Sequence, residues 1–136
     1  MSLITTTTED LYLRAIHVLS EKQAQGAVST NTLAAEMRTT PASVTDMLKK
    51  LREKSLVYYK PYYGVKVTEQ GQAIALQLLY RQEVWAQFLA QELQLPESEI
   101  KLLAPQLAVV RDEKLIQSLV TLVGTKPQNQ AHTLAS

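Results

Sequence analysis

The segment from Ser29 to Leu51 constrains the fold most strongly, because it contains two short helical patterns separated by only three residues. Ser29 is a suitable N-cap for a helix that stops near Met37. Thr40 can cap the next helix, with Pro41 at its first position. In this second helix the apolar residues recur with helical spacing, so one stripe is predicted to be buried. The stripe consists of Val44, Met47, Leu48 and Leu51.

The opposite face of the second helix is formed by small and polar residues. It carries Ala42, Ser43, Asp46, Lys49, Lys50 and Glu53. Two helices joined by a tight turn, the second of them amphipathic, are the elements of a helix-turn-helix. An ordinary hairpin of two helices is the alternative that these residues leave open, since the turn lacks the glycine often found there.

A ribbon rich in tyrosine follows these helices. The stretch YYKPYYGVKV, residues 58–67, holds four of the six tyrosines in the chain. Apolar and polar residues alternate on either side of a turn around Pro61 to Gly64, which predicts a two-stranded hairpin. A hairpin directly after such a helix is the wing of a winged helix. Strand alternation predicts that about two of the four tyrosines pack on the core.

Another helix is predicted before this region. Thr8 or a neighbouring threonine can cap a helix that runs from about Glu9 to Gln23, and Gly26 follows its end. Its predicted apolar stripe is Leu11, Ala15, Val18 and Leu19.

Three more helices are predicted after the ribbon. A long apolar helix is expected over residues 69–93, with Thr68 as its cap. Pro96 starts the next helix, and Pro105 should kink or end it because proline removes a backbone hydrogen bond. Asp112 caps the last helix, and Gly124 occupies its C-terminal cap position.

These patterns predict a mostly α protein. Residues 4–71 are expected to form a winged helix-turn-helix domain with a small β-hairpin wing, and residues 72–124 an all-α dimerisation domain. The long helix is too apolar for a small domain to bury alone, and a homodimer would cover it. We expect Trp85, Phe88, Leu89 and Leu93 to form the dimer core. Residues 125–136 are expected to be a disordered polar tail.

Charge is concentrated in the middle of the chain. From Ser29 to Lys66 there are seven lysines and arginines against three acidic residues, although the whole chain has a net charge of only +1. A basic region of this kind is a modest indication of nucleic-acid binding. The absence of cysteine excludes disulfides, zinc ribbons and thiol catalysis. With two histidines and no phosphate-binding glycine loop, an enzyme is not expected.

No apolar run reaches the length of a transmembrane helix, so a cytoplasmic protein without a membrane partner is expected. The expected partner is double-stranded DNA. At the start of the second helix, Ala42 can contact a thymine methyl group, and Asp46 can accept only from a cytosine amino group. Lysines on this helix and on the wing are expected to contact phosphates. The predicted DNA-binding residues are Thr39, Thr40, Pro41, Ala42, Ser43, Asp46, Lys49, Lys50, Lys60, Tyr62 and Lys66.

Four stretches of the chain resemble one family, that of the diphtheria toxin repressor and the manganese transport regulator. They are DLYLRAIHVLSE, VSTNTLAAEM, TTPASVTDMLKKLREKSLVYYKPYYGVKVTEQG and LLYRQEVWAQFLAQELQLPESEI. This family consists of dimeric winged-helix repressors that Mn²⁺ or Fe²⁺ activates. The resemblance therefore implies a dimeric, sequence-specific transcriptional regulator, expected to be a repressor that binds a palindromic operator. A winged helix used only for protein interaction is the alternative of another class.

The resemblance also implies where the family's metal ligands fall in this sequence. These positions hold Leu11, Arg14, Gln82, Pro105, Ala108 and Val109. None is a carboxylate or an imidazole, the side chains that a divalent ion would need here. Arg14 would also repel a cation and needs an anionic partner, for which Asp10 and Glu83 are candidates. We therefore expect a regulator that works without a metal cofactor. A manganese- or iron-responsive repressor with a shifted site, in which Asp10 becomes a ligand, is the alternative.

Overall fold

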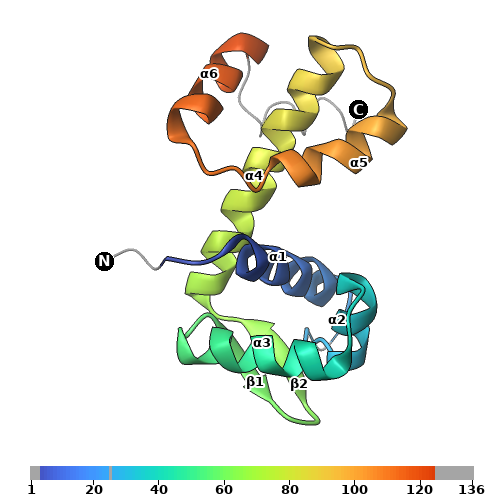
Figure 1. Ribbon diagram of the computed structural model, residues 1–136, viewed down its shortest axis with the longest axis vertical. Helices are drawn as coiled ribbons and strands as arrows, with labels where there is room; N and C mark the ends of the chain where they lie inside the picture. The colour runs from blue at the N-terminus through green and yellow to red at the C-terminus, as the bar shows by residue number, and fades with distance from the viewer. Residues whose placement is uncertain (1–3, 25, 125–136) are drawn as a thin grey trace. The chain divides into compact units, whose positions relative to one another are not determined.

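The computed structural model describes residues 4–24 and 26–124, and these form two compact units with a boundary between Leu76 and Gln77 (Figure 1). The first unit contains α1 (Thr7–Glu21), α2 (Thr30–Met37), α3 (Pro41–Glu53), β1 (Val57–Lys60) and β2 (Gly64–Val67). Helix α4 (Glu69–Gln91) spans the boundary, and α5 (Glu97–Leu107) and α6 (Glu113–Val123) follow it. The predicted mostly α class with one hairpin after the two short helices is confirmed. Within the described residues, no helix has the length and apolarity needed to cross a membrane.

Side-chain caps fix where the helices of the first unit begin. The hydroxyl of Thr6 accepts the backbone N–H of Glu9 at 3.1 Å, and the Glu9 carboxylate accepts the N–H of Thr6 at 2.9 Å. This reciprocal pair is a capping box. Ser29 and Thr40 cap α2 and α3 as predicted, each by accepting the backbone N–H three residues further on. Local sequence therefore determines these three helix starts.

The turn between α2 and α3 closes without a glycine. Arg38 takes the left-handed conformation, with φ at 54° and ψ at 50°. The N–H of Thr39 donates to the carbonyl of Ala34 at 3.0 Å, which satisfies one of the last carbonyls of α2. Arg38 thus takes the place of the glycine that such a turn often contains.

The core of the first unit is centred on α1 and α3. The predicted stripe of α3 is confirmed, since Val44, Leu48 and Leu51 are fully buried and Met47 packs against them. The predicted stripe of α1 is wrong in part, because its most buried residues are Leu13 and Ile16. The buried members of this core are Tyr12, Leu13, Ala15, Ile16, Val28, Leu33, Ala34, Val44, Leu48, Leu51, Leu56, Val57, Val65 and Ala75.

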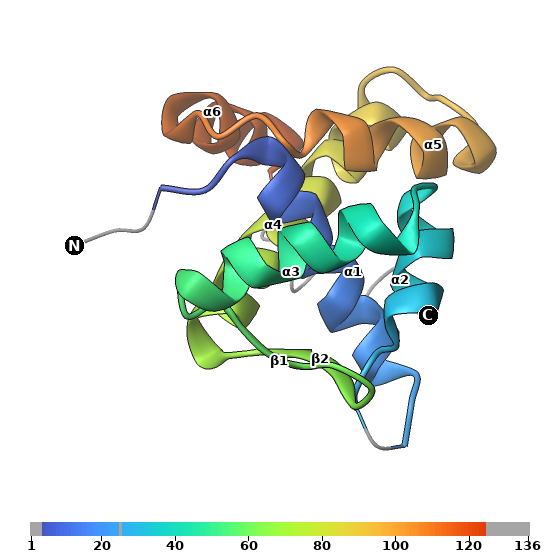
Figure 2. The same cartoon turned by 60° about the horizontal axis from the view of Figure 1, so that its bottom comes forward.

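The hairpin has β1 and β2 antiparallel, with Tyr58 opposite Lys66 and Tyr59 opposite Val65. On its other side, β2 forms two 2.9 Å backbone hydrogen bonds between Val65 and Val28. Figure 2 shows α3 beside the hairpin within this unit. The wing is therefore held along one edge by the segment that leads into α2.

Only one of the four hairpin tyrosines packs against the core, and it is Tyr59. Tyr58, Tyr62 and Tyr63 are exposed. The prediction that about two would be buried is wrong, because Tyr62 and Tyr63 lie in the turn, where strand alternation does not apply. The consequence is a wing with three exposed aromatic rings.

Helix α4 starts close to the backbone that precedes the wing. Thr68 caps it by accepting the N–H of Gly71 at 3.2 Å, and the Thr68 hydroxyl donates to the carbonyl of Ser55 at 2.8 Å. A Cβ at Gly71 would lie only 2.1 Å from the carbonyl oxygen of Leu56. Glycine is therefore required at this position by the close approach of two backbone segments.

In the second unit a small core joins α4 to α6. It consists of Val84, Ile116 and Leu119, packed against Trp85, Phe88, Leu115 and Val120. Helix α4 ends at Gln91, two residues before the predicted end. Helix α5 does not end at Pro105, since it continues to Leu107. The caps predicted at Asp112 and Gly124 are confirmed. The predicted disordered tail, 125–136, lies outside the described residues.

One ion pair ties the start of α1 to the residue that follows α3. The ammonium of Lys54 lies 2.8 Å from the carboxylate of Glu9 and 3.2 Å from the carbonyl of Ile4. Burial raises the pKa of Glu9, but the hydrogen bonds from Lys54 and Thr6 and the charge of Lys54 outweigh burial. The pKa of Glu9 is therefore lowered from its ordinary value of 4.5.

We predict that Lys54→Met lowers the free energy of unfolding at pH 7 by about 1 kcal/mol, because Lys54 is one third exposed and the pair is partly screened by solvent. Because the pKa of Glu9 is lowered in the folded state, its charged form stabilises the protein above pH 4.5. This stabilisation is lost as the pH falls through the folded-state pKa of Glu9. Urea unfolding at pH 7 and pH 3 should therefore show the difference from wild type shrinking at the lower pH. Lys101→Met, which removes an exposed pair, is the control. An equal loss in both variants would contradict this role.

Candidate nucleic-acid interface

The burial of one side of α3 turns its other side to solvent. Ala42, Ser43 and Asp46 are exposed on the first two turns of the helix, and Lys49 and Lys50 on the third. Thr40 and Pro41 are also exposed, whereas Thr39 is half-buried. The predicted contact residues of this segment therefore share one surface. Small side chains at its start would allow close approach to a flat partner.

Two of these residues are already hydrogen-bonded to each other. The Thr40 hydroxyl donates to the Ser43 oxygen at 3.0 Å while it accepts the Ser43 N–H at 3.2 Å. The helix start is thus ordered without a partner. Ser43 keeps acceptor capacity for a further hydrogen bond.

The wing adds a second group of predicted residues. Lys60, Tyr62 and Lys66 are all exposed, and the Lys60 ammonium lies 5.3 Å from the centre of the Tyr63 ring. A Cβ built on Gly26 would lie 3.6 Å from the Lys66 ammonium, so Lys66 extends along the connection between α1 and α2. No acidic residue occurs between Lys54 and Thr68, so the ribbon itself does not repel an anion.

Arg52 links α3 to the wing, and sequence reasoning missed it. Its guanidinium donates to the carbonyl of Tyr59 at 3.4 Å and lies 5.5 Å from the centre of the Tyr59 ring. One side chain at the end of α3 therefore contacts both the backbone and the ring of a β1 residue. The sequence marked Arg52 only as one of several basic residues, because a backbone carbonyl partner has no signature in sequence.

The positions of the family's metal ligands carry side chains without a negative charge, and these are buried to different degrees. Ala108 is buried, and Leu11, Arg14, Gln82, Pro105 and Val109 are half-buried. Burial lowers the pKa of Arg14, and the charge of Glu36 partly offsets this. Glu36 lies on α2 and was not among the expected partners of Arg14.

These residues do not fit a divalent ion. Among the residues that the structure describes, no group of three or more histidine, cysteine, aspartate or glutamate side chains comes together. Asp10, the candidate for a shifted site, is buried and accepts a hydrogen bond from the Thr5 hydroxyl at 2.5 Å. The family ligand set is therefore absent from the six matched positions.

Ala108, one of the six matched positions, has a cationic hydrogen-bond partner within the second unit. The Arg81 side chain donates from Nε to the carbonyl oxygen of Ala108 at 2.7 Å. This hydrogen bond joins α4 to the end of α5, where the last carbonyls of a helix favour a positive charge.

The residues predicted for the dimer core differ in exposure. Trp85 and Phe88 pack edge to face with ring centres 5.9 Å apart, and both are half-buried. The Nε1 atom of Trp85 is buried without a hydrogen-bond partner. Leu89 is buried within its own chain, whereas Leu93 lies beyond the end of α4 and is about half exposed.

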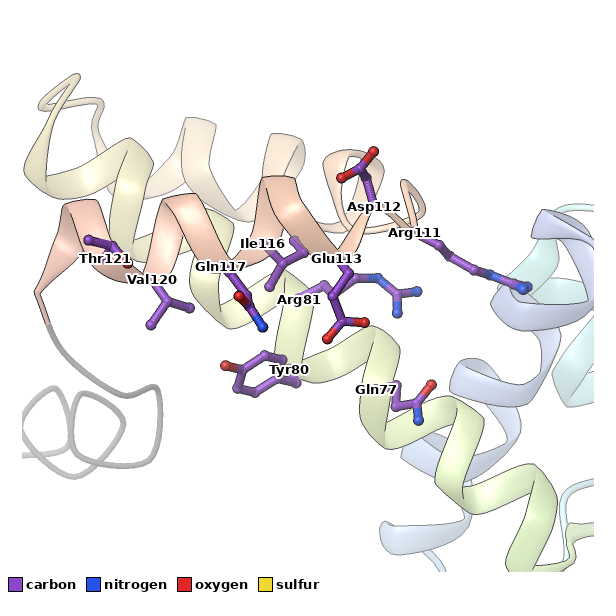
Figure 3. Close-up of a pocket in the computed structure, with 10 residues that line it drawn as sticks. All are labelled: Gln77, Tyr80, Arg81, Arg111, Asp112, Glu113, Ile116, Gln117, Val120 and Thr121. Carbon is purple, nitrogen blue, oxygen red and sulfur yellow. The ribbon is translucent and has the colours of Figure 1, made fainter. Parts of the chain in front are cut away.

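A groove of about 850 Å³ lies along α4 and α6 in the second unit (Figure 3). Arg81 and Arg111 contribute positive charge to it, and Asp112 and Glu113 contribute negative charge. Ile116 and Val120 add apolar surface. This mixture favours no single class of ligand, and none of the predicted site residues lines the groove.

Two family descriptions match consecutive parts of the chain. Residues 4–65 match the N-terminal DNA-binding domain of iron-dependent repressors, and residues 68–134 match their metal-binding and dimerisation domain. This second match contradicts the expectation that no metal cofactor is involved. That expectation was wrong because it was drawn from six positions and not from the domain as a whole.

Known proteins give the same assignment. The chain is 34% identical over 86 residues to the HTH-type transcriptional regulator MntR of Bacillus subtilis. The matched stretch covers 63% of this chain and 59% of that protein. The match thus spans less than two thirds of the relative's length. Among solved structures, the manganese regulator SloR has a TM-score of 0.71 at 26% identity, covering 88% of this chain and 55% of that one. A manganese-dependent transcriptional repressor in complex with manganese has a TM-score of 0.75 at 25% identity, with coverage of 85% and 52%.

Proposed function

Since this chain belongs to the iron-dependent repressor family, we propose that it is a transcriptional repressor that binds double-stranded DNA as a homodimer and responds to manganese or iron. The observation that carries the DNA-binding part is the exposed surface of the first unit, where α3 packs against β1. That surface combines a helix start with small side chains and four exposed lysines: Lys49, Lys50, Lys60 and Lys66.

In this proposal α3 enters the major groove with its N-terminal residues against base edges. Ala42 contacts a thymine methyl group, Ser43 hydrogen-bonds to a base, and Asp46 accepts from a cytosine amino group. The wing lies beside the groove and contacts the backbone. Arg52 is a positioning residue here, because it fixes β1 against the end of α3.

We predict that replacing Lys49, Lys50, Lys60 or Lys66 singly by glutamine weakens binding to all DNA sequences alike. Each change should lower the slope of log affinity against log salt by about one, because one phosphate contact is lost. Fluorescence anisotropy over a salt series measures both quantities. Lys114→Gln, an exposed lysine on α6, is the matched control. An altered sequence preference with an unchanged slope in Lys60→Gln would contradict the phosphate assignment.

The homodimer is supported by the match of residues 68–134 to a dimerisation domain. The second unit also exposes large apolar side chains, among them Leu93, Leu102 and Leu122. We infer that residues 4–71 bind DNA and that residues 72–124 form the dimer. Two-fold symmetry then implies a palindromic operator, with half-sites about one helical turn apart or a multiple of that spacing.

We predict that Leu93→Asp converts the dimer to a monomer at micromolar concentration. Leu93 is about half exposed within one chain, so the fold tolerates the change. Burying a leucine side chain contributes about 1.5–3 kcal/mol, and a symmetric contact loses two of them, so dissociation should become at least about a hundredfold easier. Sedimentation equilibrium measures this, with Ser98→Asp as the control. A monomeric wild-type protein at the same concentration would refute the dimer.

The response to metal rests on the family match and on the manganese-named relatives. A bound divalent ion would supply positive charge that holds acidic side chains together. The six matched positions cannot contribute such side chains, and no three acidic, histidine or cysteine side chains come together in the part of the chain that the structure describes, so a shifted site would have to gather its ligands when the ion binds. This corresponds to the alternative hypothesis of a repressor whose metal site is formed by other residues than in the rest of the family.

We predict that a chelator weakens DNA binding at least about tenfold, and that Mn²⁺ or Fe²⁺ restores it, because the metal-bound form is the DNA-binding form in this proposal. A mobility-shift titration with EDTA, followed by addition of each ion, measures the effect. Mg²⁺ at the same concentration is the control for general charge screening. Equal affinity in chelator and in manganese would contradict a metal response.

The proposal also separates this protein from two other classes. The relatives are named as regulators, which supports a regulator and not an enzyme. We infer a cytoplasmic location from the bacterial relatives, because bacterial DNA lies in the cytoplasm. A winged helix used only for protein interaction would not bind DNA in the salt series above, and the lysine-rich surface favours DNA.

A further inference from the structure

Three exposed tyrosines on the wing form a group that we term the tyrosine tip: Tyr58, Tyr62 and Tyr63. Tyr62 is fully exposed, and Tyr58 and Tyr63 are 68% and 75% exposed. The other exposed large apolar residues of the first unit are Ile4 and Leu76, among the residues described there. Tyr62 and Tyr63 are neighbours in the turn and Tyr58 lies on β1 of the same hairpin, so one short ribbon exposes three aromatic side chains and is a candidate interaction surface.

The backbone holds the tip in one shape. The N–H of Tyr63 donates to the carbonyl of Lys60 at 3.0 Å and closes the turn. Tyr62 has a φ of 72°, a backbone conformation that residues other than glycine rarely adopt. At Gly64 a Cβ would lie 2.7 Å from the carbonyl oxygen of Val28, so the turn packs tightly against the segment before α2. The rings of Tyr62 and Tyr63 are therefore presented by an ordered turn, and the ring of Tyr58 by strand β1.

Lysines are interleaved with the rings. Lys60 lies against the ring of Tyr63, and Lys66 pairs across the strands with Tyr58. Because the ribbon from Lys54 to Thr68 has no acidic residue, its outward face offers aromatic surface and positive charge together. A DNA backbone presents the complementary pair, the apolar faces of deoxyribose rings between phosphates.

We propose that the tyrosine tip packs its rings on deoxyribose beside the site that α3 reads, and that its hydroxyl groups donate to phosphate oxygens. This inference rests on the proposed DNA-binding function. Tyrosine hydroxyls are established donors to phosphate in protein–DNA complexes. Three rings bury at most roughly 450–750 Å², less than the roughly 800 Å² that each partner buries in a standard protein–protein interface. A single DNA-binding module buries a similar area, about 600–1,000 Å², so the lysines between the rings are what favour DNA over a protein partner.

The rings and the lysines make different contributions to binding. A ring on a sugar contributes apolar contact and no charge, so its removal leaves the number of phosphates neutralised unchanged. Removal of a lysine lowers that number. Ring variants are therefore expected to lose affinity at constant salt slope, which separates the tip from the lysine contacts.

The test compares Tyr62→Gly and Tyr63→Ala, singly and together, with wild-type protein on an operator selected from random duplex DNA. Glycine adopts a positive φ freely, so Tyr62→Gly removes the ring and keeps the turn. We expect affinity to fall about tenfold for each ring, equivalent to about 1.4 kcal/mol, with an unchanged salt slope. Hydroxyl-radical footprinting should lose protected sugars next to the α3 site. Tyr80→Ala, which removes an exposed tyrosine from α4, should change neither measurement.

Replacing Tyr62 and Tyr63 by phenylalanine separates the contribution of the rings from that of the hydroxyls. We expect these variants to keep the sugar protection and most of the affinity. Wild-type binding by the double ring variant, with an unchanged footprint, would overturn the inference and leave the proposed function standing. Failure of the wild-type protein to bind any duplex would overturn the proposed function itself.

Discussion

The burial of one stripe of α3 is the constraint on which the first unit depends. Val44, Leu48 and Leu51 are fully excluded from water, and this fixes the rotation of the helix about its axis. Burying three aliphatic side chains contributes several kcal/mol, at about 1.5–3 kcal/mol each, so no other rotation competes. The outward position of Ala42, Asp46 and the lysines is a consequence of that burial. The candidate interface is thus determined by the core beneath it.

Sequence predicted the features that short-range chemistry decides. Hydroxyl caps at Ser29 and Thr40, the cap at Asp112 and the glycine at position 124 depend on neighbours within four residues. The stripe of α3 followed from helical spacing in the same way. Sequence failed where long-range packing decides. The buried face of α1 is shifted to Leu13 and Ile16, because the elements packed against it select the face.

The candidate site shows the same division. The lysines and the start of α3 were predicted from composition and spacing, and the structure exposes them. Arg52 and Tyr63 were not, because their roles depend on a backbone carbonyl and on the shape of a turn. The expectation of metal independence failed for another reason. Side chains at six positions test only one arrangement of ligands, whereas the family match extends over the whole of residues 68–134.

Gly71 has a consequence for attempts to stabilise this protein by design. Replacing a helix glycine by alanine commonly gains about 0.5–1 kcal/mol, so Gly71 in α4 would be an early choice. Here the added methyl group would meet the carbonyl of Leu56 at 2.1 Å, and backbone would have to move. In a survey of all substitutions, Gly71 would rank with the buried leucines in its intolerance of change, although it contributes no side chain to the core. The cost of a substitution there is set by the distance between two main-chain segments.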